Sequence, residues 1–91
     1  MDYSKLSDKQ INAAVAMKLI SIDGGYLCST FDPCNNPADA WPIILQSRLY
    51  IDPIYIKEWC VTSECDSYRE IHENPLRAAM LVYLMMQGDE Q

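Results

Sequence analysis

The segment NPLRAAMLVYLMMQG, residues 74–88, decides the fold, because it predicts one helix that is apolar on almost every side. Asn74 suits the cap, Pro75 suits the first helical position, and Gly88 suits the position just past the end. A helix that is apolar all round belongs either in the centre of a core or at a subunit interface. In a chain of 91 residues little other protein remains to cover it, so we expect a homodimer. The expected interface consists of Met80, Tyr83, Leu84 and Met86.

The start of the sequence predicts an amino-terminal helix. Ser7 is followed three residues later by Gln10, the spacing of a capping box, and Leu6 and Ile11 occupy the positions of a hydrophobic staple. Apolar residues then recur with the helical period, so we expect a helix from about Asp8 to Leu19. The Asp-Gly-Gly sequence at 23–25 should turn the chain, and residues 26–30 should be extended.

A loop rich in proline and asparagine, FDPCNNP at residues 31–37, precedes a second predicted helix. Two prolines and two asparagines within seven residues exclude a helix interior and a central strand. Asn36 followed by Pro37 instead predicts a cap and a first helical position. We expect a short helix at 38–47, with an apolar face formed by Trp41, Ile44 and Leu45.

The middle of the chain predicts a small antiparallel sheet. Residues 48–56 are typical of a strand, and Pro53 favours an edge or a bend. Residues 57–62 alternate as a second strand, and the tight link between the two favours a hairpin. A third, exposed strand at 67–71 is left open. One α+β domain over residues 1–91 follows, with three helices on a small antiparallel sheet of two or three strands, in the order α-α-β-β-(β)-α.

Charge and hydropathy limit the classes of function. Thirteen acidic residues against seven basic ones give a net charge of −6, with no basic stripe for phosphate backbones. We therefore expect no direct nucleic-acid binding, although an acidic mimic aimed at a DNA-binding protein stays an alternative. The start does not read as a signal peptide, and the longest apolar stretch, residues 78–86, is too short to span a bilayer. These features predict a soluble protein in a reducing cytosol, with no membrane partner.

The cysteines favour ordinary reduced thiols over a metal site. Cys28 and Cys34 form one pair and Cys60 and Cys65 another, and neither gap is the two-residue spacing typical of structural zinc. His72 offers a further ligand, so zinc remains the alternative. Cys60 lies in an apolar strand and is interpreted as a packing residue. We expect no metal and no cofactor.

Catalytic patterns are weak in this sequence. His72, the one histidine, stands among charged residues, and no nucleophile or phosphate-binding motif accompanies it. Asp32 and Asp39 could perform acid–base chemistry or hold a metal, but they are read more simply as turn and helix-start residues. We therefore expect no catalytic residues and no enzyme activity.

One region concentrates polar and aromatic side chains beyond what caps and turns need. Amides, carboxylates and rings gather at the start of the second helix, and the start of the last helix adds an amide and a guanidinium. Such a combination can bind a ligand or a partner, and the structural interpretation stays open beside it. The candidate binding residues are Phe31, Asp32, Asn35, Asn36, Asp39, Trp41, Asn74 and Arg77.

Three blocks of sequence resemble the NinX-like family of lambdoid bacteriophages. They are FDPCNNPADAWPII at 31–44, NPLRAAMLVYLMMQ at 74–87, and the opening MDYSKLSD at 1–8. The middle, residues 48–73, departs from the family's pattern. The resemblance implies a small phage accessory protein made in the host cytoplasm, and it implies no established enzyme activity.

The leading functional hypothesis is a non-enzymatic phage accessory protein that binds and modulates a host protein or defence factor. One alternative is a protein that sequesters a small nucleotide-like ligand, with a ring for stacking and Arg77 for phosphate. A weaker alternative is a metal-dependent enzyme that uses the cysteines or the Asp32 and Asp39 carboxylates.

Overall fold

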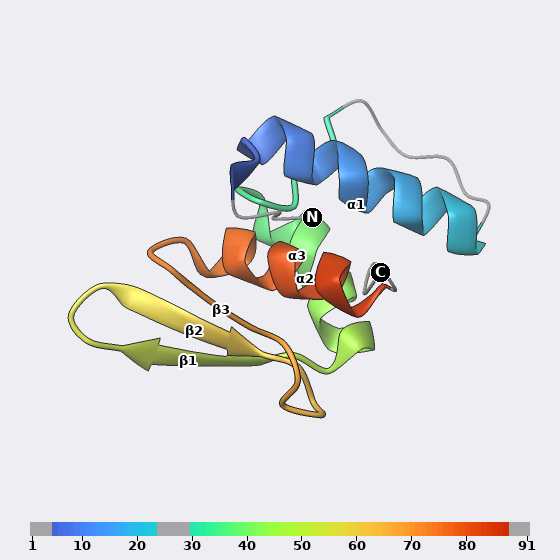
Figure 1. Cartoon of the computed structure of the whole chain (residues 1–91). Coiled ribbons are helices and arrows are strands. Elements are labelled where there is room, and N and C mark those ends of the chain that lie inside the picture. Colours follow the sequence, from blue (N-terminus) through green and yellow to red (C-terminus); the bar gives the residue numbers. More distant parts are fainter. Residues whose placement is uncertain (1–4, 24–29, 88–91) are drawn as a thin grey trace.

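The fold is a single central helix covered by two helices and a sheet, as a computed structural model shows for residues 5–23 and 30–87 (Figure 1). Helices α1 (Asp8–Asp23) and α2 (Pro37–Ser47) come first. Strands β1 (Tyr50–Ile54), β2 (Glu58–Thr62) and β3 (Arg69–His72) follow, and α3 (Pro75–Met86) comes last. The order is α-α-β-β-β-α, so the predicted α+β fold is confirmed and includes the third strand.

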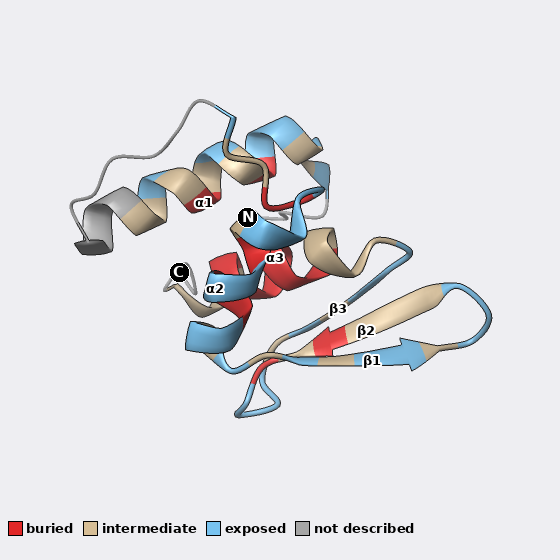
Figure 2. Ribbon diagram, turned by 180° about the vertical axis from the view of Figure 1, so that it is seen from behind, coloured by how far each residue is buried: buried red, intermediate tan, exposed pale blue. Residues whose placement is uncertain are grey.

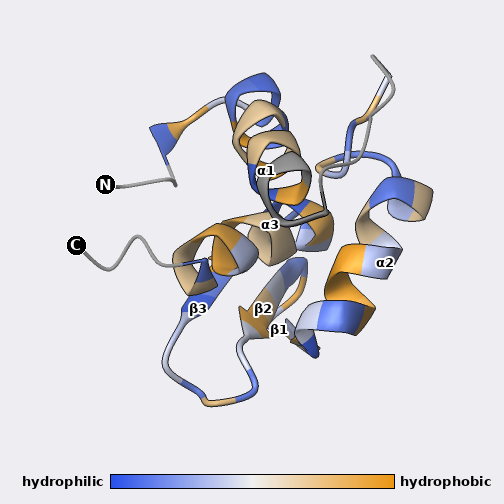
Figure 3. Cartoon of the chain, turned by 90° about the vertical axis from the view of Figure 1, so that its right-hand side faces the viewer, coloured by the Kyte–Doolittle hydropathy of each residue, from blue (hydrophilic) through white to orange (hydrophobic). Residues whose placement is uncertain are grey.

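Helix α3 is the core of the molecule. Seen along this helix, α1 lies above it, α2 beside it and the sheet below it (Figure 3). Every residue from Ala78 to Leu84 is at most 4% exposed (Figure 2). The cap on Asn74 and the start at Pro75 are confirmed, because the Asn74 side chain accepts hydrogen bonds from the first turn. Gly88 lies outside the described residues.

The burial of α3 corrects the expected oligomer interface. Met80, Tyr83 and Leu84 are buried inside a single copy of the chain, and Met86 is partly buried. The sequence argument underestimated how completely two helices and three strands can surround one short helix. These side chains are therefore not available to a second copy, while the homodimer itself stays a prediction.

The sheet is antiparallel with β2 in the middle, and β1 and β3 are its edges. Ile51 on β1 and Val61 on β2 face each other across the register and lie against α3 and the core. Tyr50, Asp52 and Ile54 alternate with them and lie on the opposite, outer face. Pro53 lies in the edge strand β1, as predicted. Proline is tolerated in an edge strand, which pairs with a neighbour on one side only.

The two amino-terminal helices differ in detail from the prediction. The capping box of α1 is present, with Ser7 N donating to Gln10 Oε1 at 2.8 Å and Gln10 N donating to Ser7 Oγ at 3.2 Å, but α1 continues to Asp23. Helix α2 turns Ala40, Ile43 and Ile44 toward α3. The expected face was therefore wrong for Trp41 and Leu45, which are exposed.

The expected turn at 23–25 and the extended segment at 26–30 fall largely on residues 24–29, which lie outside the described part of the chain. Over the described residues, no helix combines the length and the apolar character needed to cross a membrane.

Candidate functional site

Most of the candidate binding residues meet where the 31–37 loop passes between α1 and α3. Asn12, on α1, holds this loop with both ends of its amide. Its Nδ2 donates to Asp32 Oδ1 at 2.6 Å, and its Oδ1 accepts from Cys34 N at 3.1 Å. Asp32 N in turn donates to Asp39 Oδ2 at 2.9 Å, which ties the loop to the first turn of α2. The Asp32 and Asp39 side chains therefore fix the loop.

Arg77 links the start of α3 to the start of α1. Its Nη1 donates to Asp8 Oδ1 at 2.6 Å, and its Nη2 donates to the Leu6 carbonyl oxygen at 2.6 Å. The Arg77 side chain is only 12% exposed, whereas that of Asp8 is 41% exposed. A partly buried ion pair with a second hydrogen bond to the backbone holds the two helices in register.

Two asparagines complete the connections. Asn74 Oδ1 accepts from Leu76 N at 2.9 Å, while Asn74 Nδ2 donates to the Cys34 carbonyl oxygen at 2.7 Å. Asn35 Nδ2 lies 3.3 Å from both Asp8 Oδ2 and Asp32 Oδ1. The loop, α1 and α3 are thus joined by one polar network, which consists of Asp8, Asn12, Asp32, Cys34, Asn35, Asp39, Asn74 and Arg77.

The remaining candidates lie outside this polar network. Asn36 caps α2 by accepting from Ala38 N at 3.0 Å, and Phe31 is partly buried against the core. Trp41 points away from the core and is 56% exposed. Five of the eight candidates therefore belong to the polar network, and the sequence missed Asp8 and Asn12. A polar Asn12 beside the buried Ile11 was the available signal, because asparagine is a weak helix former that needs a partner there.

The polar groups of the network are engaged with one another and hold the fold together. Its donors and acceptors bind one another, and within the described residues no buried side-chain nitrogen or oxygen lacks a partner. A ligand at this place would have to displace hydrogen bonds that already join three elements.

Asn74 tests the structural interpretation. Asn74→Ala removes both the cap of α3 and the bond to the Cys34 carbonyl, so we expect a loss of about 1.5 kcal/mol in the free energy of unfolding. Asn36→Ala is the matched control, because the Asn36 side chain makes only the capping bond among those described, and its loss should cost about 0.5 to 1 kcal/mol. Urea denaturation measures both, and equal losses would contradict a joining role for Asn74.

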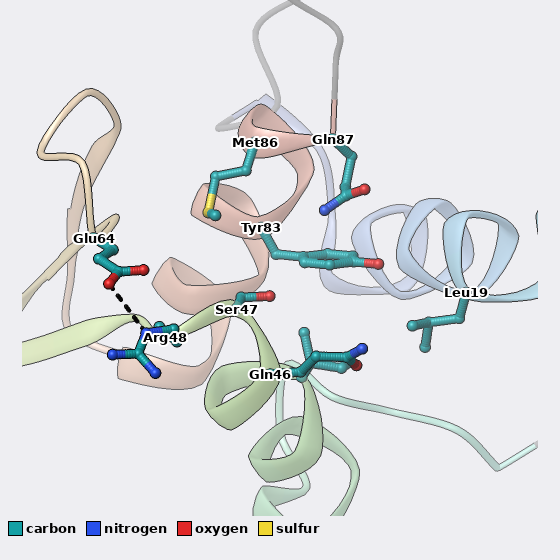
Figure 4. A pocket seen from close by; sticks show the side chains of 9 residues that line it. Leu19, Gln46, Ser47, Arg48, Glu64, Tyr83, Met86 and Gln87 are labelled. Atoms are coloured by element: carbon teal, nitrogen blue, oxygen red, sulfur yellow. Dashed lines mark ion pairs between the residues drawn. The ribbon is translucent and has the colours of Figure 1, made fainter. Parts of the chain in front are cut away.

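A cavity of about 270 Å³ lies elsewhere, among the later parts of α1, α2 and α3 (Figure 4). The Tyr83 ring extends between Gln46 of α2 and Leu19 of α1. At the rim, Arg48 Nε lies 3.1 Å from Glu64 Oε2. The Arg48 backbone is left-handed, with φ 56°, and its N–H closes the end of α2. None of these residues was among the candidate binding residues, although Tyr83 was expected at a subunit interface, because the cavity depends on how three helices end together.

The cysteines differ strongly in their chemistry. Burial raises the pKa of the Cys34 thiol to about 12, with Asp8 and Asp32 adding to the effect. Hydrogen bonds from Ser63 and Ser67 lower the pKa of the exposed Cys65 thiol to about 7. Ser63 Oγ already accepts from two backbone N–H groups, so its own hydroxyl is left to donate to Cys65 Sγ at 3.4 Å.

The cysteines and His72 were considered above as possible metal ligands. The described residues contain no cluster of three or more cysteine, histidine or acidic side chains placed to hold a metal ion. Cys28 lies outside the described part of the chain. His72 is exposed, and its Nδ1 accepts from Asn74 N at 2.9 Å, so that nitrogen is already engaged.

Cys65 should therefore be the most reactive of the described thiols. We expect iodoacetamide to modify Cys65 with a rate that rises with pH around a midpoint of about 7, because the thiolate is the reactive form. Cys34 should stay unmodified in the folded protein. Mass spectrometry of tryptic peptides across pH 5 to 9 gives both rates. Ser67→Ala should move the midpoint upward, and an unchanged midpoint would show that the serine bonds do not stabilise the thiolate.

Large apolar side chains are exposed on the β1–β2 hairpin. Tyr55 and Ile56, in the three-residue loop 55–57, are 88% and 99% exposed. Tyr50 and Ile71 are also exposed, on the outer face of the sheet. We call these residues together with Ile54 the hairpin surface. Exposed apolar side chains that lie close together on a small protein are typical of an interaction site.

The chain was compared with known families and proteins. A family model described as "Bacteriophage P22, NinX" matches residues 2–87. The chain belongs to the bacteriophage P22 NinX family. The matched range includes residues 48–73, the middle segment between the blocks that carry the resemblance. Searches of curated proteins and of solved structures found no match. Membership of the NinX family supports the assignment of the chain as a bacteriophage accessory protein. It assigns no partner and no reaction.

Proposed function

We propose that this NinX protein is a non-enzymatic accessory protein that acts in the host cytoplasm by binding a host protein or defence factor. One contrast carries the proposal. The polar residues that could have formed a catalytic or ligand site are engaged in the polar network, while large apolar side chains lie exposed on the sheet and on α2. Tyrosine and tryptophan are frequent anchors of protein interfaces. Within residues 5–23 and 30–87, the exposed aromatic residues are Trp41, Tyr50 and Tyr55.

The small-ligand alternative would use a different site from the one around Arg77 that the sequence indicated. Arg77 is engaged by Asp8 and the Leu6 carbonyl, so it offers little to a phosphate group. The cavity beside Tyr83 is the better candidate, because it is close in size to known small-molecule sites. Its one described cation at the rim, Arg48, is paired with Glu64, so the cavity favours a small neutral molecule over a nucleotide.

The homodimer remains part of the proposal only in a changed form. Because α3 is covered within one copy, a dimer would have to use exposed residues such as Trp41 and Leu45. Light scattering at a protein concentration of roughly tens of micromolar tests this. A dimer with a dissociation constant below that concentration would be detected directly.

The proposed function is tested by recovering the protein from infected cells through an affinity tag. Mass spectrometry should then find one host or phage protein in near-stoichiometric amount, and extraction should find no small molecule in that amount. Arg48→Ala at an exposed ion pair provides a folded control that should recover the same protein. Recovery of a stoichiometric small molecule without any protein would overturn the proposal in favour of the ligand alternative.

A further inference from the structure

The tip of the β1–β2 hairpin keeps two large apolar side chains in solvent. Ile54 and Glu58 are the last paired residues, and Tyr55, Ile56 and Lys57 form the loop between them. Tyr55 has a left-handed backbone with φ 55°, a conformation that glycine or asparagine adopts at much lower cost than tyrosine. Neither the strained Tyr55 nor the almost fully exposed Ile56 contributes to the core, because neither side chain packs against it.

The outer face of the sheet continues this apolar tip. Across the register, Asp52, Cys60 and Ile71 form one row, and Ile54 and Glu58 form the next row toward the tip. Alternation along the strands puts these side chains on the face opposite Val61 and α3. None of the described helices covers this face (Figure 1). Ile71 and Ile54 therefore lie in neighbouring rows of one uncovered face, and Tyr50 lies in the row beyond Ile71.

The charged side chains near the tip that lack an ion-pair partner within the described residues are all acidic. Lys57 Nζ lies 3.3 Å from Glu73 Oε2, so the cation of the loop is already paired. Asp52 and Glu58 flank Ile54 on the outer face, and they make no ion pair with any residue in the described part of the chain. An apolar tip beside two unpaired carboxylates is complementary to an apolar pocket bordered by lysine or arginine.

We propose that the hairpin surface docks Tyr55 and Ile56 into an apolar pocket on a partner protein whose rim is basic. This inference rests on the proposed function and names the chemistry of its partner. A second copy of the chain fits this surface poorly, because a symmetric contact would bring the same carboxylates together on chains that each carry −6. Strand addition along β1 is disfavoured by Pro53, which lacks the N–H that a ladder needs.

Site-specific photo-cross-linking in extracts of infected host cells tests the docking surface. A photoreactive amino acid replaces one exposed aliphatic residue at a time on three different elements: Ile56 in the hairpin, Leu45 on α2 and Met17 on α1. We expect a discrete protein adduct from position 56 and none from position 17. Adding Glu58→Lys to the position 56 protein should abolish the adduct, whereas Asp66→Lys, in the turn at the other end of β2, should not.

The purified adduct partner then gives the quantitative test. Ile56→Ser should weaken its binding by at least about tenfold, and Asp52→Lys with Glu58→Lys by a similar factor. Asp66→Lys should change it less than about twofold. Raising the salt concentration should weaken wild-type binding and leave the double lysine variant nearly unaffected. Thermal melting of each variant shows whether the fold is intact, and Lys57→Ala provides a further folded variant in the same loop.

Each other result has a definite meaning. An adduct from position 45 or 17 but not 56 would overturn the docking inference and leave the proposed function standing. No protein adduct from any of the three positions would overturn both. An adduct between two copies of the chain would identify a dimer surface, and an adduct at 56 that is insensitive to Glu58→Lys and to salt would overturn the basic rim.

Discussion

Replacing Leu84 by alanine should lower the free energy of unfolding by about 3 kcal/mol. Leu84 is 1% exposed in the middle of α3, so the shortened side chain leaves a cavity that helices and sheet on all sides can only partly fill. A domain of this size is stabilised by only about 5 to 10 kcal/mol in total, so the loss is a large share. Urea denaturation followed by tryptophan fluorescence measures it.

The same substitution at Leu45 is the control. Leu45 is 57% exposed on α2, and Leu45→Ala should change the free energy of unfolding by less than about 0.5 kcal/mol. The comparison also separates the core role of α3 from an interface role. If Leu84 were buried only in a dimer, the unfolding midpoint would depend on protein concentration, and we expect it not to. A concentration-dependent midpoint would contradict the single-copy core.

Replacing Arg77 by methionine should cost roughly 2 to 3 kcal/mol. The methionine retains much of the side-chain volume but leaves the Asp8 carboxylate and the Leu6 carbonyl without the guanidinium. The Arg77 side chain is 12% exposed, so solvent screens this pair much less than a surface pair. Arg77→Lys should recover only part of the loss, because lysine lacks the planar fork that reaches both acceptors.

Arg48→Met at the exposed pair with Glu64 is the matched control. Those two side chains are 72% and 52% exposed, and the expected loss is below about 0.5 kcal/mol. Asp8→Asn completes a double-mutant cycle with Arg77→Met, whose coupling energy isolates the ion pair. Equal losses at Arg77 and Arg48 would show that the polar network does not hold α1 to α3.

The sequence predicted the elements whose signals are local. Caps at Ser7, Asn36 and Asn74 act within one helical turn, and the structure places a helix after each of them. The hairpin was predictable because the link between its strands, residues 55–57, is short, and this is also a local signal. The burial of α3 was not predictable in this way, because it depends on how completely distant segments cover it.

The candidate site shows the same division. The 31–36 loop and the start of α3 were grouped by composition, and the structure brings them together through the Asn74 bond to Cys34, residues 40 apart in sequence. Their partner Asp8 gave no local sign of that contact, and Asn12 gave only the weak one of a polar residue beside the buried Ile11. Trp41 was expected on the apolar face of the second helix, but its neighbours Ala40, Ile43 and Ile44 face α3 instead. Which side of a helix is covered depends on the position of the other elements.

The order of the elements along the chain has a consequence during synthesis. Helix α3 follows every other element in the sequence, and α1, α2 and the sheet all pack against it. As the ribosome makes the protein, those elements leave the exit tunnel with their apolar faces uncovered, and short helices without such a partner are only marginally stable in water. The domain can therefore complete its fold only after α3 has emerged, and until then the nascent chain is exposed to chaperones and proteases of the cell that makes it.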